Sequence, residues 1–430
     1  MEILFKDIKL FSPGHPHHGQ PVCLLVKDGK IAALDTEAPP VSGMTFNAGG
    51  LAVSTGWFDL QAALNEPGLE HKEDVTSLCE AAAAGGFTDV AVQPNTRPAI
   101  QKRDGVAFVK NAASFTPVRL HSLAAVTRDT AGEELAEMVD LYHAGAVAFS
   151  DGLHPLCQSS VIARALQYLQ HLDALLLNRA DEPQLTANGQ MHEGVTSTML
   201  GMKGLPALAE EMAVKRDLAL LEHFGGRLHF STISTAAALE LIRQAKQQGL
   251  AVTCDMAAHQ LSFIDEDLAS FDTNLKVLPP FRSRADAEAL LQGLIDGTID
   301  AVVSAHQPQD TESKELEFDL ATAGISSIET AFASIYTATA GKLSTEKLLS
   351  LFTTGPRQVL RMPVPELATG AKACLTIFND NTEWQVTASD FRSKSKNSPL
   401  IGKTLNCRPL GVVNGTKNYF SEALKQKLIS

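Results

Sequence analysis

Polar side chains follow the apolar runs in the middle of the chain, and these residues are the ones that could do chemistry. Asp151, Asp181 and Asp255 each follow such a run, and three neighbouring carboxylates could serve acid–base chemistry or bind a hard cation such as Mg²⁺. Carboxylates of solvated loops are the simpler interpretation, and we favour it. Arg97 and Arg179 could bind an anionic ligand. The nearby histidines form no H-x-H or H-x-x-x-H pair: His71, His154, His192, His229, His259 and His306.

Other catalytic or cofactor motifs are missing from the sequence. No G-x-S-x-G and no Cys–His arrangement offers a nucleophile, and no G-x-G-x-x-G or G-x-x-x-x-G-K-[ST] loop would bind phosphate. The formal net charge of −13 argues against a nucleic-acid or anionic-membrane surface. The six cysteines are scattered without a C-x-x-C pair, which favours reduced thiols in a cytoplasm. No leader-like start and no apolar run of about 20 residues indicates secretion or membrane insertion.

The elements that must position these residues follow a regular alternation. Eight short apolar runs, beginning with AVSTGWFDL and ending with DAVVSA, alternate with segments of helical pattern, several of which end at glycine. Eight such units over about 250 residues predict a (β/α)₈ barrel, in which functional residues follow the strands. We expect the barrel over residues 53–362. Short strands before and after it predict a small β-sandwich built from both chain ends, residues 1–52 and 363–430.

Seven segments, in unbroken order, resemble the dihydroorotase branch of the cyclic amidohydrolases. GWFDLQAALNEPG matches that family's G-F-x-D-x-H-x-H-x-R-E-P-G, and AAAAGGFTDVAVQPNTRP matches its G-G-[FY]-T-x-x-x-x-M-P-N-T-x-P. The others are AVAFSDG, RLHFSTIST, GLAVTCDMAAHQL, LKVLPPFR and DAVVSAHQPQD, and DFRSKSKNSPLIG resembles the family's closing β-domain. The resemblance covers nearly the whole chain and implies the same barrel and β-domain.

The resemblance also implies a zinc hydrolase of pyrimidine biosynthesis. Such an enzyme opens a cyclic amide with hydroxide held by one or two Zn²⁺ ions, which lower the pKa of bound water towards about 7. The family supplies histidines from the first, fifth and sixth strands, a bridging carboxylate from the fourth and an aspartate from the eighth. An arginine and asparagines bind the carboxylate of the substrate.

Transferred position by position, the resemblance fails at these ligands. The metal-ligand positions hold residues that bind zinc poorly: Gln61, Ala63, Asn178, Thr232 and Ala305. Asp151 and His306 are the residual candidates for a catalytic role, with His306 interpreted as structural. Among the substrate-binding positions Asn95 is retained, whereas Asn65 and Leu278 replace the family's residues. The sequence therefore predicts no metal site and no cofactor.

From this pattern we expect a catalytically inactive, cytoplasmic, dihydroorotase-like protein that acts as a structural or regulatory partner. The resemblance to non-catalytic family members implies a homo-oligomer, or a complex with aspartate carbamoyltransferase, and no nucleic-acid or membrane partner. The alternative is an active dihydroorotase or related cyclic amidohydrolase with a rebuilt site, which would require zinc.

Overall fold

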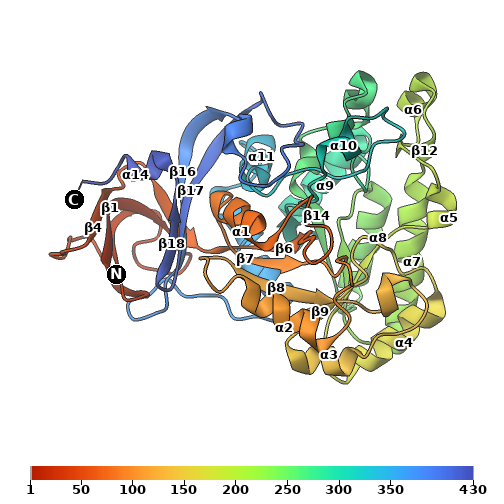
Figure 1. Cartoon of the computed structure of the whole chain (residues 1–430), viewed down its shortest axis with the longest axis horizontal. Helices are drawn as coiled ribbons and strands as arrows, with labels where there is room; N and C mark the ends of the chain where they lie inside the picture. The colour runs from red at the N-terminus through yellow and green to blue at the C-terminus, as the bar shows by residue number, and fades with distance from the viewer. Residues whose placement is uncertain (1, 430) are drawn as a thin grey trace.

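Eight parallel strands form a barrel in the middle of the chain (Figure 1), and the computed structural model describes residues 2–429. The strand order is β15-β14-β13-β10-β9-β8-β7-β6, so successive barrel strands lie side by side, and the short β11 (Met191–His192) and β12 (Gly204–Leu205) between β10 and β13 pair only with each other. All eight predicted apolar runs are strands of this barrel: β6 (Trp57–Ala62), β7 (Phe87–Val92), β8 (Arg119–Ala124), β9 (Ala148–Phe149), β10 (Leu176–Arg179), β13 (Leu228–Ser231), β14 (Val252–Ala257) and β15 (Ala301–Val303).

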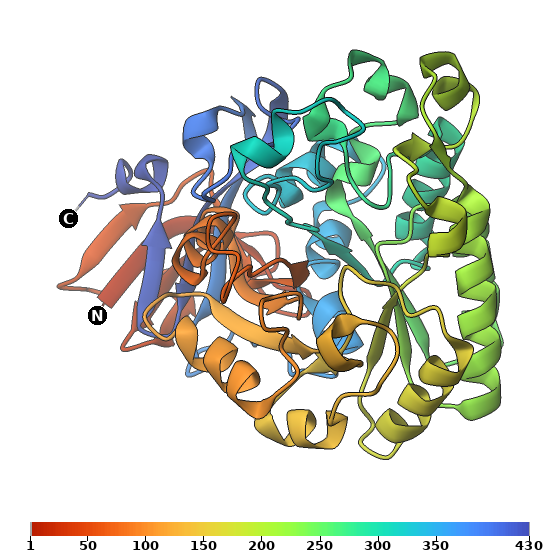
Figure 2. The same cartoon turned by 45° about the vertical axis from the view of Figure 1, so that its right-hand side comes forward.

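Helices cover the outside of the barrel, as Figure 2 shows for the long α7 in yellow-green. Their boundaries follow local signals: α1 begins after Asp74, whose side chain accepts a hydrogen bond from the Ser77 amide, and α9 ends at Gly297 with φ 82°. The main helices are α1 (Val75–Ala84), α2 (Arg103–Ala112), α3 (Met138–Ala144), α4 (Ser159–Gln170), α7 (Ala207–Phe224), α8 (Ala236–Gln247), α9 (Arg284–Asp296), α11 (Ala331–Ala338), α12 (Thr345–Ser350) and α13 (Thr354–Val359).

The barrel closes between its first and last strands. The Ala63 amide donates to the His306 carbonyl at 2.9 Å, beside a bridge between Ala62 and His306. Below them, the buried carboxylate of Asp59 accepts hydrogen bonds from the amide and the hydroxyl of Ser304. Burial raises the pKa of Asp59 to about 6. The first residues of the resembling motif therefore join the seam of the barrel.

Both ends of the chain contribute to a second sheet, as predicted from their short strands (Figures 1 and 2). Its order is β18-β17-β16-β5-β1-β2-β3, with β4 on β1, and it encloses a hydrophobic core of its own. The predicted boundary at residue 53 falls inside β5, which pairs with β1 and β16. The strands are β1 (Glu2–Phe11), β2 (Pro21–Lys27), β3 (Lys30–Asp35), β4 (Met44–Asn47), β5 (Ala52–Thr55), β16 (Cys374–Gln385), β17 (Thr404–Asn414) and β18 (Lys417–Phe420).

Aromatic packing fixes the barrel to this β-domain. Trp57 is fully buried and stacks on Phe332 of α11, with ring centroids 4.0 Å apart. It also contacts Phe352 and Phe378, the latter from β16. Burial of a ring of this size contributes several kcal/mol, so the two domains share one interface rather than a flexible linker.

A buried charge network lies near the same interface. Asp89 of β7 accepts hydrogen bonds from Arg119 and His121 of β8 and from Arg357 of α13. Burial alone would raise the pKa of Asp89, but the bonds from His121 and Arg119 outweigh burial and hold it well below its usual range. Asp89 thus stays ionised among three basic groups. Among residues 2–429, no helix has the length and apolar character needed to cross a membrane.

Candidate active site

A small pocket opens at the carboxyl ends of the barrel strands, where the sequence places its candidate residues. The space that can hold the centre of a water molecule is about 30 Å³, enough for about two ordered waters. A ring-shaped ligand would therefore enter only after the lining side chains move. Those side chains include Gln61, Gln93, Arg179, Thr232, His259, Leu278, Ala305 and His306.

Three of the five replaced ligand positions line this pocket. Gln61, Thr232 and Ala305 lie at its wall, whereas Ala63 and Asn178 are buried behind it. Thr232 and Ala305 both have left-handed backbone, with φ 53° and 49°. This conformation is unfavourable for alanine and more so for a β-branched residue. The strand ends of β13 and β15 therefore hold a strained backbone although their side chains carry no ligand atom suited to zinc.

Gln61 belongs to a buried hydrogen-bond cluster centred on Asp255. The Gln61 side-chain amide donates to the Asp255 carboxylate at 2.8 Å, and His229 Nε2 lies 2.9 Å from the same oxygen. The other oxygen accepts from the Thr232 amide at 2.6 Å. Gln93 donates to Gln61 at 3.3 Å. This cluster places a glutamine amide, held at both ends, where the resemblance implies a histidine ligand.

Asn178 is held in a separate buried network. Its amide group donates to Asp217 of α7 at 2.6 Å and to the Leu156 carbonyl, while its oxygen accepts from the Leu156 amide. Burial raises the pKa of Asp217 to about 6, against the opposing effect of Arg216. The side chain of Asn178 thus holds the loop after β9 and joins it to α7.

Asp151, the residual carboxylate candidate, stabilises a turn instead of facing the pocket. One oxygen accepts from the amides of Val126 and Thr127, each at 2.9 Å, and the other accepts from the Thr127 hydroxyl. Burial raises the pKa of Asp151 although these bonds oppose the shift. The structure places it 2% exposed and absent from the pocket wall.

The two histidines at the pocket differ in what their rings bind. His306 accepts from the Ser327 amide at Nδ1, and its Nε2 lies 3.2 Å from the Glu73 carboxylate, so both nitrogens are engaged. His259 has a buried Nδ1 without any hydrogen-bond partner among residues 2–429. Burial lowers the pKa of His259 to about 4. Its imidazole is therefore neutral at pH 7, and it is the pocket histidine with a nitrogen left unused.

The predicted substrate positions are also dispersed. Asn95 lies outside the pocket wall, donating to the Asp151 carbonyl at 3.0 Å and accepting from the Leu153 amide at 2.9 Å. Asn65 has left-handed backbone and a buried side-chain nitrogen without a partner. Leu278 lines the pocket and is 43% exposed. Of these three, only Leu278 stands where it could contact a ligand in the pocket.

Arg179, which the sequence named with Arg97 as a possible anion-binding residue, lines the pocket. It directly follows Asn178 at the end of β10, a signal that marks its position but not its surroundings. Its one hydrogen bond is to the Leu153 carbonyl at 3.4 Å, and it forms no ion pair with a described residue. Burial lowers its pKa, and the charge of Arg282 adds to that effect, while the charges of Asp181 and Glu210 oppose it. A guanidinium in such surroundings favours an anionic ligand.

The side chains of this pocket do not fit the zinc centre that the resemblance implies. Within residues 2–429 no three His, Cys, Asp or Glu side chains are grouped so as to hold a metal ion. Amide, hydroxyl and methyl groups stand at the implied ligand positions, and they are poor donors for zinc. A metal in this protein would thus be held by groups other than those of the family pattern.

Solved structures confirm the fold. L-Hydantoinase from Arthrobacter aurescens superposes with a TM-score of 0.85 over 98% of this chain and 96% of its own, at 24% identity. Dihydropyrimidinase from Brevibacillus agri gives a TM-score of 0.81 over 98% and 95%, at 17% identity. At these identities the likeness shows the barrel with its β-domain.

Sequence relatives are closer. The model of the "Dihydro-orotase-like" family matches residues 50–238. Proteins named dihydroorotase are 40% identical over 94% of this chain and 96% of their own in Syntrophus aciditrophicus, and 39% identical over 91% and 92% in Pelotomaculum thermopropionicum. A third, from a Geobacter strain, is 37% identical over 96% and 98%.

These relatives correct two expectations. The expectation of a catalytically inactive structural or regulatory partner is wrong, because the relatives carry the name of the enzyme and fit the alternative of a dihydroorotase or related cyclic amidohydrolase better. The expectation of no cofactor is wrong too, because the resemblance that gives the family also implies its metal. With 40% identity over nearly its whole length, the chain belongs to the dihydroorotase family.

Proposed function

We propose that this protein is a dihydroorotase-type hydrolase of pyrimidine biosynthesis that opens a cyclic amide at its C–N bond. The observation that carries the proposal is the 40% identity to a protein named dihydroorotase, spread over 94% of the chain and thus over the barrel and the β-domain together. The pocket at the carboxyl ends of the strands is where barrel enzymes bind substrate. We further propose a cytoplasmic location.

The reaction consumes one water molecule. The water oxygen bonds to the ring carbonyl carbon, the C–N bond of the ring breaks, and the ring nitrogen takes up a proton. The product is an open-chain ureido acid. Protein groups must orient the ring, stabilise the charge on the carbonyl oxygen and exchange protons with water and nitrogen.

Arg179 is the group that would bind the carboxylate of dihydroorotate. It lines the pocket and forms no ion pair with a described residue, although the charges of Asp181 and Glu210 act on it from a greater distance. The arginine that the resemblance implies for this task is replaced by Asn65, whose side-chain nitrogen is buried without a partner among the described residues. The anion-binding role would therefore have moved from the loop after β6 to the end of β10.

His259 and the glutamine pair supply further polar groups of the pocket. A neutral imidazole with an unused nitrogen can accept a proton, and His259 meets that description. Gln93 and Gln61 present side-chain amides, joined by a hydrogen bond of 3.3 Å, at the same wall. Such amides can donate to a ring carbonyl oxygen.

The test is hydrolysis of dihydroorotate by the purified full-length protein, followed by the loss of the ring's ultraviolet absorbance across pH 6–9. Hydantoin, which has the cyclic ureide but no carboxylate, serves as the matched substrate control. Metal content is measured before and after dialysis against a chelator, with activity followed in parallel. Turnover of dihydroorotate supports the proposal, and no turnover at any pH with zinc supplied refutes it.

The predicted partners remain proposals. We propose that the chain forms a homo-oligomer and can associate with aspartate carbamoyltransferase, an expectation that follows from the family resemblance. Size-exclusion chromatography with light scattering measures the first, and co-elution of the two purified proteins measures the second. A monomer that elutes apart from the carbamoyltransferase would contradict both.

A further inference from the structure

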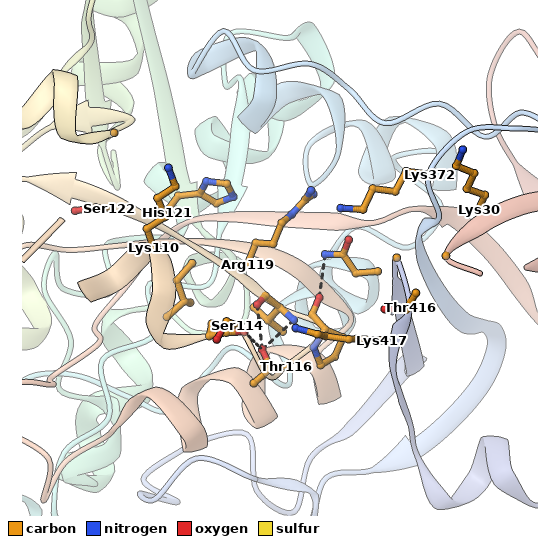
Figure 3. A pocket seen from close by; sticks show the side chains of 18 of the residues that line it. Lys30, Lys110, Ser114, Thr116, Arg119, His121, Ser122, Lys372, Thr416 and Lys417 are labelled. Atoms are coloured by element: carbon orange, nitrogen blue, oxygen red, sulfur yellow. Dashed lines mark hydrogen bonds between the residues drawn. The ribbon is translucent and has the colours of Figure 1, made fainter. Parts of the chain in front are cut away.

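A second, larger cavity lies at the opposite end of the barrel, between the barrel and the β-domain (Figure 3). It can hold the centre of a water molecule over about 730 Å³, compared with about 30 Å³ at the carboxyl end. Ligand-binding pockets commonly fall between about 300 and 1,000 Å³. The two pockets share no lining residue. This cavity is therefore separate from the candidate active site.

Its walls come from both domains. The start of β8 and the helix α2 form the barrel side, which carries Arg119 and Lys110. The turns β2–β3 and β17–β18, with the segment before β16, form the other side and carry Lys30, Lys417 and Lys372. Figure 3 shows these basic side chains bordering one space from the two domains. A ligand held between them would contact both domains at once.

The positive charge of this cavity, which we call the lysine pocket, is unusual for so acidic a protein. The chain has a net charge of −13, yet four lysines, Arg119 and His121 line the lysine pocket with a single carboxylate, Asp28. Arg119 is paired with Asp89 at 2.8 Å. None of the four lysines forms an ion pair with a described residue. Like charges gathered without partners raise the local potential and attract an anion of more than one charge.

The rest of the wall is apolar or hydroxylated. Lining residues on the barrel side share small or branched aliphatic character: Val106, Ala113, Pro117, Val118 and Leu120. Ser114 and Thr416 add hydroxyl groups near the lysines. An apolar wall suits the face of a ring, and lysine ammonium groups bind phosphates as point charges. The combination matches a ligand with one apolar part and one highly charged part.

We propose that the lysine pocket binds a small phosphate ester that joins a planar ring to two or more phosphates, the chemistry of a nucleoside di- or triphosphate. The ring lies against the aliphatic wall of the barrel, and the phosphates lie among the lysines. The site is independent of the proposed hydrolase activity, because it lies at the other end of the barrel. Binding there stabilises the contact between the two domains.

Isothermal titration calorimetry of the full-length protein at low salt tests this, with ATP, adenosine and tripolyphosphate as probes. We expect saturable binding of ATP to one site, weakening as salt is added, with adenosine and tripolyphosphate each binding less tightly than ATP. Because a hydrogen bond to a charged group corresponds to about a tenfold change in affinity or more, Lys372→Gln/Lys417→Gln should weaken ATP binding about 100-fold.

The matched control is Lys215→Gln/Lys425→Gln, which removes two positive charges outside the lysine pocket. It should leave ATP affinity within about twofold of wild type, since exposed charges at a distance are largely screened. Lys110→Gln, on the barrel side, provides a second variant in case the double variant is poorly folded by circular dichroism. Absence of saturable ATP binding, or an equal loss in the control, overturns the proposal. Tripolyphosphate or adenosine binding as tightly as ATP overturns the two-part ligand.

Discussion

Replacing Asp89 by asparagine should destabilise the protein by about 4 kcal/mol, because it leaves a buried arginine without its counter-charge. The side chains of Asp89 and Arg357 are each 2% exposed, and their nearest oxygen and nitrogen lie 2.9 Å apart. Removing one partner of such a pair costs about 3–5 kcal/mol. The pair with Arg119, whose side chain is 42% exposed, adds less than about 1 kcal/mol.

Urea unfolding followed by circular dichroism at pH 7 measures this loss. Asp296→Asn is the matched control, because Asp296 pairs with Arg243 at 2.9 Å with both side chains partly exposed, and it should cost less than about 1 kcal/mol. The direction in which this stability loss changes with pH follows from the lowered pKa of Asp89. Its contribution is present above its unfolded pKa of about 3.9 and is lost as the pH falls through the folded value, so the deficit of the variant should shrink in acid.

A loss of unfolding free energy below about 1 kcal/mol at pH 7 would refute the reasoning, because removing the partner of a desolvated charge costs more than that. Asp89→Leu/Arg357→Met removes both charges and keeps much of the buried volume. It should recover most of the loss. If this double variant is as unstable as Asp89→Asn, the charge of Arg357 is not the cause.

Three further predictions concern the candidate active site. Arg179→Gln should lower kcat/KM for dihydroorotate about 10- to 150-fold, mainly through KM, with hydantoin affected less; equal losses for both substrates would contradict an anion-binding role. Gln61→His/Ala63→His restores the H-x-H spacing and should raise the zinc content per chain, measured by mass spectrometry; an unchanged content would show that these positions cannot ligate. His259 has its pKa lowered to about 4, so wild type loses stability as the pH falls from about 6.5 to 4, by up to about 3 kcal/mol. His259→Gln should remove that part of the pH dependence of stability, measured by urea unfolding. A stability–pH curve of the variant that runs parallel to that of wild type would contradict the burial of a neutral imidazole.

The fold could be predicted because its signals are local. Apolar runs and terminal glycines such as Gly145 and Gly297 lie within a few residues of the elements that they delimit. Even β9, with two residues, follows the run AVAFS. The pairing of the two chain ends was also indicated, because strands that do not alternate with helices occur at both ends. The exact boundary between the β-domain and the barrel could not be predicted. β5 lies directly before the first barrel strand in the sequence but belongs to the other sheet.

The candidate site was only partly predictable. The replaced ligand positions followed from the resemblance to the dihydroorotase family, but their present partners lie far away in the sequence. Gln61 is 194 residues from Asp255, and His306 is 233 residues from Glu73. The hydrophobic periodicity of the sequence does not predict such long-range pairs. The function predicted from these replacements was wrong because missing ligands describe one metal pattern, whereas relatedness over 94% of the chain reports on the whole protein.

The pairing of β5 with β16 has a consequence for how the protein is made. Thr55 leaves the ribosome about 320 residues before Leu375, its partner in the sheet. At a synthesis rate of about 5–20 residues per second, roughly 15 to 65 seconds pass between the synthesis of the first strands and that of the last ones. During that time the edge of β5 and the ring of Trp57, whose partner Phe332 is also late, stay uncovered. Newly made chains should therefore depend on a chaperone that shields this N-terminal segment until synthesis ends.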